Sequence, residues 1–244
     1  MPTDTIDEFA RADALIESVE SVFEDLENRT RRRRIAKRVV TAFAAFLVLI
    51  IAGNALIMGS VLWFRWTDAG ASPAGVSIDN FRIVDDHVWR GAAPGDQGLR
   101  EVAALGATTI VDLRSEDALD VNDTLIRDLG LTRYSLPVRD GQLPSADQAA
   151  AFLDIVANSD GPVFLHCGAG IGRSGAMTAF YLNATGQAGG TGALRHNLSV
   201  GPPSLEQIVF SMSTSGGDYD RPGVLITAAS RLLDSPRRIW HNLT

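Results

Sequence analysis

The longest hydrophobic stretch of the chain covers residues 39–64, which are 26 residues without a charged side chain. As an α-helix this stretch would measure about 39 Å, more than the roughly 30 Å of a bilayer's hydrocarbon core. Trp63 and Trp66 lie at its far end, where aromatic rings suit the membrane–water interface. Ala69-Gly70-Ala71 resembles a signal-peptide cleavage site, but the 38 preceding residues and the length of the stretch favour a retained anchor. The pattern predicts one transmembrane helix.

From residue 78 onward, short apolar runs alternate with stretches of helical periodicity. The predicted strands are 81–84, 87–90, 108–113, 131–138 and 162–166, of which the first two form a short hairpin. The predicted helices are 97–105, 119–129, 145–157, 176–182 and 225–233, and Ser145 caps the third. Repeated strand–helix units are typical of an α/β fold with a central, mostly parallel sheet flanked by helices. The N-terminal helix and the transmembrane helix come in addition.

Residues 6–26 carry apolar side chains at steps of three and four, the spacing of a short coiled coil. These positions are Phe9, Ala12, Ile16, Val19, Phe23 and Leu26. Fewer than three heptads are present, so self-association through this helix is a hypothesis, and a solvated helix is the alternative. We therefore divide the chain into an N-terminal amphipathic helix with a basic segment (1–38), a transmembrane helix (39–64), a linker (65–77) and a globular domain (78–244).

The formal charge of −7 is unevenly distributed along the chain. Residues 31–38 hold five arginines and the only lysine, Lys37, directly before the apolar stretch, whereas Arg65 alone follows it closely. The positive-inside rule then predicts a single-pass protein with a cytoplasmic N-terminus and an extracytoplasmic domain. Residues 65–244 hold 14 arginines and 20 acidic side chains, a net charge of −6 that disfavours nucleic acids as partners.

The only cysteine lies in a glycine-rich segment between a predicted strand and a predicted helix. Three glycines allow consecutive backbone N–H groups to face one concavity that suits an anion, and the helix start adds its own free N–H groups. A helix N-terminus and a nearby cation favour a thiolate, and a planar guanidinium matches two oxygens of a phosphate. The segment is suited to hold a phosphoryl group against a thiolate. It reads His166-Cys167-Gly168-Ala169-Gly170-Ile171-Gly172-Arg173-Ser174-Gly175.

Other interpretations of this segment fit less well. A buried cysteine usually serves as a small core side chain, but three glycines and an arginine make a poor core. The dinucleotide pattern G-x-G-x-x-G also matches, yet it needs an acidic residue about 20 positions later, and none lies between Gly175 and Glu206. A Walker loop requires glycine in place of Cys167 and lysine in place of Arg173.

Cys-x5-Arg with His before it and Ser-Gly after it resembles the signature loop of the cysteine-dependent protein tyrosine and dual-specificity phosphatases. The likeness extends to Val-Asp-Leu-Arg at 111–114 and Leu-Pro-Val-Arg-Asp at 136–140, and covers roughly residues 78–212. The arginine-rich, lysine-poor and Ala/Gly-rich composition is associated with bacterial proteins, so together with the predicted transmembrane helix we expect a membrane-anchored bacterial member. The resemblance implies a tyrosine phosphatase-like fold, a cysteine nucleophile at Cys167, and no metal or cofactor.

The resemblance also assigns roles to the neighbours of Cys167. His166 orients the loop, and Ser174 donates to the leaving thiolate or caps the following helix. The phosphate is held by the loop backbone and one guanidinium, at Gly168, Ala169, Gly170, Ile171, Gly172 and Arg173.

Displacement of an alcohol from phosphorus needs a proton for the leaving oxygen. The family places an aspartate on a loop about 30 residues before its cysteine, and Asp140 lies 27 residues before Cys167. Asp147 is the rival, but its place after Ser145 suits a helix cap better. Asp112 is expected to be structural. Gln207 either positions the hydrolytic water, as a late glutamine does in some tyrosine phosphatases, or is a surface helix residue.

The sequence thus predicts a metal-independent phosphoric monoester hydrolase with a cysteinyl-phosphate intermediate, acting on phosphotyrosine or with dual specificity. Its predicted partners are a phosphorylated protein and the lipid bilayer. The loop interior holds no Lys or Arg, which disfavours polyphosphorylated lipids. A lipid monophosphate phosphatase and a catalytically silent phosphate-binding module are the alternatives.

Overall fold

The computed structural model describes residues 4–67, 75–115, 122–214 and 218–241, with the backbone alone in 4–23, 25–27 and 234–241. The chain separates into two compact units, residues 1–53 and 54–244. Each is described by itself.

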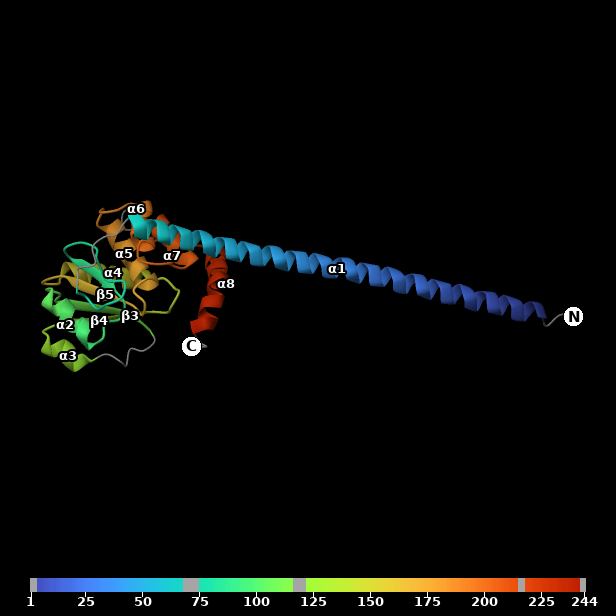
Figure 1. The fold of residues 1–244 in the computed structure, drawn as a ribbon, viewed down its shortest axis with the longest axis horizontal. Coiled ribbons are helices and arrows are strands. Elements are labelled where there is room, and N and C mark those ends of the chain that lie inside the picture. Colours follow the sequence, from blue (N-terminus) through green and yellow to red (C-terminus); the bar gives the residue numbers. More distant parts are fainter. Residues whose placement is uncertain (1–3, 68–74, 116–121, 215–217, 242–244) are drawn as a thin grey trace. The chain divides into compact units, whose positions relative to one another are not determined.

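Helix α1 (Asp4–Thr67) is a single continuous helix of 64 residues (Figure 1). Its part from Asn28 onward reaches a mean hydropathy of 2.4, and none of its most apolar window is buried. Within the described residues, α1 alone is long and apolar enough to cross a membrane, a test that a signal sequence near the N-terminus also meets. The predicted transmembrane stretch lies inside this helix, and no break in the backbone marks its start.

Five strands form one sheet in the order β1-β2-β5-β3-β4. Strand β1 pairs with β2 in antiparallel fashion, and the other three pairings are parallel. This confirms the predicted hairpin and the mostly parallel sheet. The strands are β1 (Arg82–Ile83), β2 (Val88–Gly91), β3 (Thr109–Arg114), β4 (Thr132–Val138) and β5 (Val163–His166).

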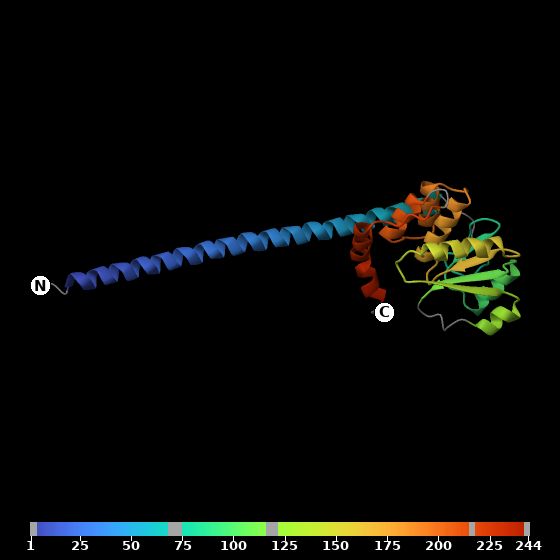
Figure 2. The same ribbon diagram turned by 180° about the vertical axis from the view of Figure 1, so that it is seen from behind.

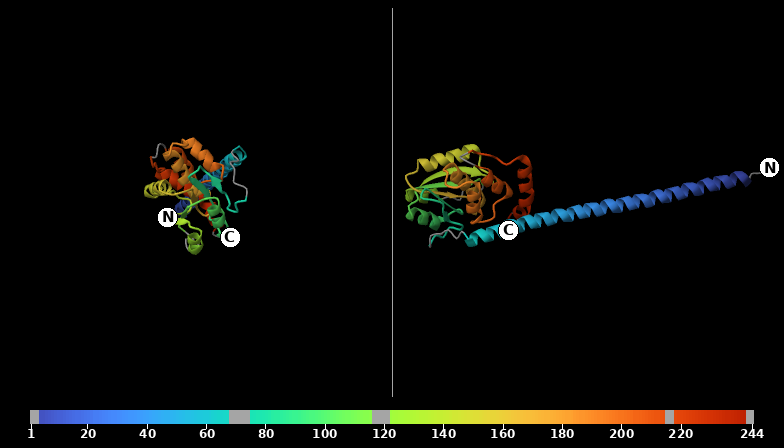
Figure 3. Two further views of the ribbon diagram at one scale, coloured as in Figure 1. Left: turned by 90° about the vertical axis from the view of Figure 1, so that its left-hand side faces the viewer. Right: turned by 90° about the horizontal axis from the view of Figure 1, so that it is seen from above.

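Helices cover both faces of this sheet, with α4 on one side and α2 and α3 on the other (Figures 2 and 3). Side chains alternate between the two faces along each strand. Val111 and Leu165 join the core beneath α4, α5 and α7, whereas Ile110 and Phe164 join the core beneath α2 and α3. The helices are α2 (Asp96–Ala104), α3 (Asp123–Asp128), α4 (Ala146–Ala157), α5 (Gly172–Ala184), α6 (Gly190–Leu198), α7 (Leu205–Ser213) and α8 (Val224–His241).

Five helices differ from the prediction by more than one residue. Helix α5 runs over 172–184 where 176–182 was predicted, and α7 has no counterpart among the predicted helices. The helix predicted over 119–129 begins only at Asp123, because the Asn122 side chain caps it by accepting from the backbone N of Leu125 at 3.1 Å; residues 119–121 lie outside the described residues. Helix α6 has no predicted counterpart, since its glycine-rich sequence lacks a clear apolar period. Helix α8 continues eight residues beyond the predicted end at 233.

Candidate active site

Strand β5 ends at His166 and α5 begins at Gly172, so the cysteine segment is a five-residue loop between a buried strand and a helix. Cys167 is 2% exposed, and its Sγ lies 3.6 Å from the Oγ of Ser174 in the first turn of α5. The N-cap residue Ile171 offers no side-chain hydrogen bond to the helix. The first N–H groups of α5 are therefore available to an anion held in the loop.

Four consecutive carbonyl groups of this loop, from Gly168 to Ile171, accept hydrogen bonds from one earlier stretch of chain, residues 80–93. A peptide unit carries its N–H opposite its C=O, so carbonyls that point outward leave the N–H groups of 169–172 facing the loop interior. This arrangement makes the loop a preformed anion site. The donors are Ala93 N to Gly168 O at 3.0 Å, Asn80 Nδ2 to Ala169 O at 2.9 Å, and Arg90 Nη2 to Gly170 O and Ile171 O at 2.9 Å each.

Arg90 supports the cysteine loop and was not among the residues predicted for the site. Its side chain is completely buried in β2 beneath the loop. Burial lowers the pKa of Arg90 to about 10, while the charge of Cys167 opposes that shift, so the guanidinium is a cation at neutral pH. The available signal was an arginine inside a predicted strand between Trp89 and Gly91, since a buried charge requires partners.

Positive φ angles at two positions allow the cysteine loop to pack closely against residues 80–93. Gly170 has a φ of +72°, and a Cβ there would lie 2.3 Å from the carbonyl carbon of Gly91. Glycine is required because the loop passes directly over the end of β2. Asn80 has a φ of 55°, a value that asparagine tolerates better than most residues, and this turn directs its amide to Ala169.

Arg173 and Asp140 meet at the same edge of the sheet. The Nη1 of Arg173 donates to the carbonyl of Val138 at 3.1 Å, and its Nη2 lies 3.2 Å from Oδ1 of Asp140. Arg173 is buried, whereas the side chain of Asp140 is 69% exposed. The structure thus brings Asp140, two residues beyond the end of β4, to Arg173. Asp147 lies in the exposed first turn of α4.

The segment that carries Asp140 is held at both ends by glutamines from two helix capping boxes. Gln148 of the α4 box donates to the carbonyl of Pro137 at 2.7 Å. Gln207 of the α7 box donates to the carbonyl of Gln142 at 3.2 Å, and its Oε1 accepts from the backbone N of Ser204 at 2.9 Å. Gln207 is 1% exposed, so its interpretation as a surface residue is wrong.

His166 and Asp112 lie under the loop and face each other across β5 and β3. His166 Nδ1 is 3.7 Å from Asp112 Oδ1. Burial lowers the pKa of His166 to about 4, with the Asp112 charge opposing the shift, so the imidazole is neutral at pH 7. Burial would raise the pKa of Asp112, but hydrogen bonds from Arg114 at 2.9 and 3.0 Å help to lower it to about 2. Arg133 pairs with the same carboxylate at 3.2 Å. Asp112 thus ties two strands together.

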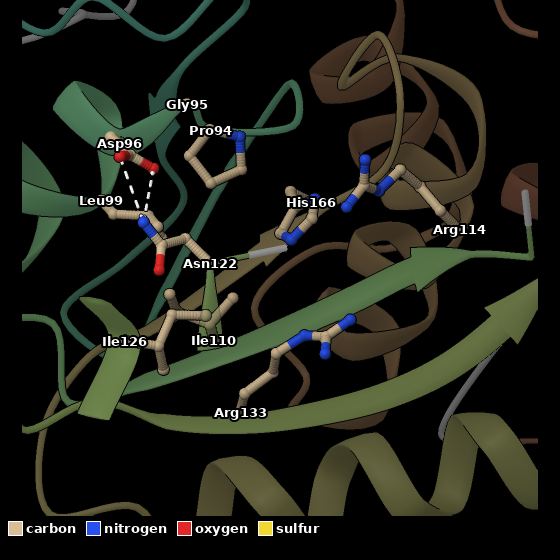
Figure 4. Close-up of a pocket in the computed structure, with 10 residues that line it drawn as sticks. All are labelled: Pro94, Gly95, Asp96, Leu99, Ile110, Arg114, Asn122, Ile126, Arg133 and His166. Carbon is tan, nitrogen blue, oxygen red and sulfur yellow. Dashed lines mark hydrogen bonds between the residues drawn. The ribbon is translucent and has the colours of Figure 1, made fainter. Parts of the chain in front are cut away.

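Beside this pair, on the face covered by α2 and α3, lies a cavity of about 60 Å³ (Figure 4). Ligand pockets are usually roughly 300–1,000 Å³, so this cavity has room for water and not for a cofactor. Among the described residues, no group of three His, Cys, Asp or Glu side chains could hold a metal ion. The cavity is lined by Pro94, Gly95, Asp96, Leu99, Ile110, Arg114, Asn122, Ile126, Arg133 and His166.

Comparison with known proteins places this site in a family. A family model described as "DSP-PTPase phosphatase fused to NAD+ Kinase" matches residues 76–207. The chain is 37% identical to "Probable NAD kinase 2, chloroplastic" of Oryza sativa subsp. japonica over 99 residues, which are 37% of this chain and 10% of that protein. It is 40% identical to human "Dual specificity protein phosphatase CDC14A" over 55 residues, which are 22% of this chain and 9% of that protein. The matches thus span about a tenth of these relatives' lengths.

Among solved structures, the core catalytic domain of the PP-IP phosphatase SIW14 from S. cerevisiae superposes with a TM-score of 0.50 at 17% identity. The superposition covers 64% of this chain and 94% of that one, and it shows a shared fold. Because the family model matches more than half of the 244 residues and includes the whole cysteine loop, the chain belongs to the DSP-PTPase family of that description, within the cysteine-dependent protein tyrosine and dual-specificity phosphatase superfamily.

Proposed function

We propose that this phosphatase hydrolyses phosphoric monoesters, with phosphotyrosine in proteins as the main substrate, through a cysteinyl-phosphate on Cys167 and without a metal. The observation that supports this most is the meeting of Arg173 and Asp140 at 3.2 Å beside the cysteine loop. A cation for the phosphate, a nucleophile and a candidate proton donor then lie within one site.

In the first step the N–H groups of 169–172 and the guanidinium of Arg173 bind the three non-bridging oxygens of the phosphate. The Cys167 thiolate attacks phosphorus, the phosphorus–oxygen ester bond breaks, and Asp140 gives its proton to the leaving oxygen. Arg90 supports this step from below, because its hydrogen bonds fix the loop carbonyls of Gly170 and Ile171.

In the second step the Asp140 carboxylate takes a proton from water, and the water oxygen attacks phosphorus. The sulfur–phosphorus bond breaks, inorganic phosphate forms, and Ser174 Oγ donates to the departing thiolate from its position 3.6 Å from Sγ. His166 acts as a neutral positioning residue behind Cys167. Gln207 is a positioning residue for the Asp140 segment, since both polar atoms of its amide are engaged at 142 and 204.

Polyphosphorylated lipids are disfavoured as substrates because residues 168–172 offer backbone donors but no further cation for a second phosphate. Phosphotyrosine is favoured because Ile171-Gly172-Arg173-Ser174-Gly175 resembles the loops that take phosphotyrosine. The name of the human relative refers to dual specificity, so phosphoserine and phosphothreonine are included in the test. A lipid monophosphate is the second candidate, since α1 is apolar enough to hold the chain at a bilayer. The rice relative is named as an NAD kinase, and the match covers only 10% of its length.

We further propose that α1 is retained as a single-pass membrane anchor. The basic residues 31–38 precede its apolar part, which by the positive-inside rule leaves the N-terminus in the cytoplasm and the phosphatase domain outside.

The test is phosphate release by the full chain in detergent and EDTA, with Cys167→Ser as the matched inactive control. Phosphotyrosine and phosphoserine peptides and a phosphatidyl monophosphate are compared at equal concentration. Metal-independent turnover that is fastest on phosphotyrosine and absent in Cys167→Ser supports the proposal. Faster turnover of the phosphatidyl monophosphate would show that a lipid monophosphate is the preferred substrate. Binding of all three without turnover would show a silent module.

A further inference from the structure

The C-terminal helix α8 exposes an unusual amount of apolar surface. Val224 is 85% exposed, Leu225 87% and Leu232 58%, although each is a large aliphatic side chain. All three come from one helix, whereas the other exposed hydrophobic residues of the phosphatase domain are scattered over several elements. A clustered apolar surface of this kind indicates an interaction site.

The opposite face of α8 is fixed to the phosphatase domain, so the outward direction is defined. Ser230 is buried, and its Oγ accepts from the backbone N of Glu206 at 3.1 Å. The Thr227 hydroxyl donates to Glu206 Oε1 at 3.2 Å. These contacts hold one side of the first turns against α7. Leu225 and Leu232 lie on the opposite side, and the exposed Arg231 lies between the two sides.

The positive net charge of residues 221–244 indicates an anionic partner for α8. Residues 221–244 hold four arginines and one aspartate, a net charge of +3. Residues 65–220 hold ten arginines and nineteen acidic side chains, a net charge of −9. The sequence of α8 also contains Trp240 near its end. Apolar and aromatic residues interleaved with arginine on one helix are typical of helices that lie in the interface of anionic membranes.

We propose that α8 lies on the surface of a bilayer containing anionic phospholipids, with Val224, Leu225 and Leu232 inserted and Arg231 at the headgroups. This proposal rests on the membrane anchor proposed above. Residues 68–77 between α1 and the phosphatase domain span at most about 36 Å when fully extended, which keeps the domain near the membrane that holds α1. The helix then gives the tethered domain a second contact and hence a fixed orientation.

The single cysteine makes a direct test feasible, because Cys167→Ser removes the only thiol of the chain. In that background Leu225→Cys or Leu232→Cys is labelled with an environment-sensitive fluorophore, and Leu105→Cys, 45% exposed at the end of α2, is the matched control. The full chains are reconstituted in vesicles of phosphatidylcholine with about one third phosphatidylglycerol, with and without lipid-borne quenchers.

We expect lipid quenching of the labels at 225 and 232 to exceed that at 105 by at least about twofold, and to weaken in pure phosphatidylcholine or in Arg231→Gln. Equal quenching at all three sites would overturn the proposal. Shielding of 225 that grows with the protein-to-lipid ratio would place a second copy on α8 and would also overturn it.

Two controls distinguish failure of the α8 proposal from failure of the proposed membrane anchor or of the proposed phosphatase activity. Vesicle flotation after carbonate extraction reports the anchor, and a chain that fails to float would overturn both. Turnover of a soluble phosphotyrosine peptide reports catalysis, and Val224→Ser with Leu225→Ser should leave it unchanged because neither residue belongs to the site.

Discussion

Arg90 and His166 are buried ionisable side chains on either side of the cysteine loop, yet burial leaves one charged and the other neutral. Arg90 keeps its charge because it donates to two loop carbonyls and faces Cys167. His166 loses its charge because burial outweighs the pull of Asp112 at 3.7 Å. At the residue scale, the loop is therefore supported by one fixed cation and one neutral ring.

Arg90→Met should weaken catalysis without removing any group that touches phosphate. The loop carbonyls of Gly170 and Ile171 lose their donor, at a cost of about 1–3 kcal/mol for the buried one. We expect lower kcat, because the loop amides that bind the phosphate are then held less rigidly. Arg90→Lys keeps the charge but not the guanidinium geometry, and should restore kcat only in part. Unchanged kcat in a folded Arg90→Met protein would contradict this role.

Because the pKa of His166 is lowered in the folded state, we expect the free energy of unfolding to decrease in mild acid. The unfolded imidazole binds a proton below about pH 6.5, but the folded one resists until its pKa of about 4. The unfolded state therefore binds more protons in this window, and stability falls as pH decreases from 6.5 to 4, by about 3 kcal/mol. Urea unfolding across this range should show the loss in the wild type and a smaller slope in His166→Gln. Parallel pH profiles would refute the prediction.

If Asp140 is the proton donor, the loss of kcat in Asp140→Asn should depend on whether the leaving group needs a proton. With an alkyl phosphate, whose leaving oxygen needs a proton, kcat should fall about 10²–10⁴-fold. With p-nitrophenyl phosphate, whose leaving group departs as an anion, the loss should be much smaller. Asp147→Asn is the matched control and should affect neither substrate. A selective loss in Asp147→Asn instead would reassign the acid.

At the scale of elements, α4 and α7 hold the segment that carries Asp140 in the same way. The N3 glutamines of α4 and α7 each complete a capping box and then reach on to residues 137 and 142, which bracket Asp140. The capping of α4 was predictable from Ser145, because a capping box is local in sequence. The hydrogen bond from Gln207 to the carbonyl of Gln142 was not predictable, since it joins positions 65 residues apart.

Gln207→Met keeps the side-chain volume and removes both hydrogen bonds of the amide. If the amide positions Asp140, the loss should be larger for alkyl phosphates than for p-nitrophenyl phosphate, and Gln148→Met should show the same pattern. If Gln207 instead positions the hydrolytic water, Gln207→Met alone should slow the second step, so that p-nitrophenyl phosphate gives a burst followed by slow turnover. Rapid-mixing kinetics distinguishes the two results.

The difference between features that are local in sequence and contacts between distant residues explains how much of the fold and site the sequence could predict. The cysteine loop from His166 to Ser174 was predicted because its chemistry lies in nine consecutive residues. The strand–helix alternation was predicted because it depends on local periodicity. Asn80 and Arg90 were missed, because their hydrogen bonds to Ala169 and Gly170 span more than 75 residues and leave no local pattern.

At the scale of the whole molecule, the single lysine provides a test of membrane orientation. Lys37 lies in the basic run before the apolar part of α1, and the remaining primary amine is the N-terminus itself. If both lie in the cytoplasm, a membrane-impermeant amine reagent should leave the chain unlabelled in spheroplasts and label it after permeabilisation. Added protease should remove the phosphatase domain without permeabilisation. Labelling of Lys37 in sealed spheroplasts would invert the orientation.

The presence of a single cysteine also has a consequence for redox chemistry. Oxidation of Cys167 to a sulfenic acid cannot be resolved by a second thiol of the same chain, because none exists. Reduction must then begin with a thiol from outside that reaches a side chain only 2% exposed. In an oxidising compartment, the working lifetime of the enzyme is therefore set by the supply of small external thiols.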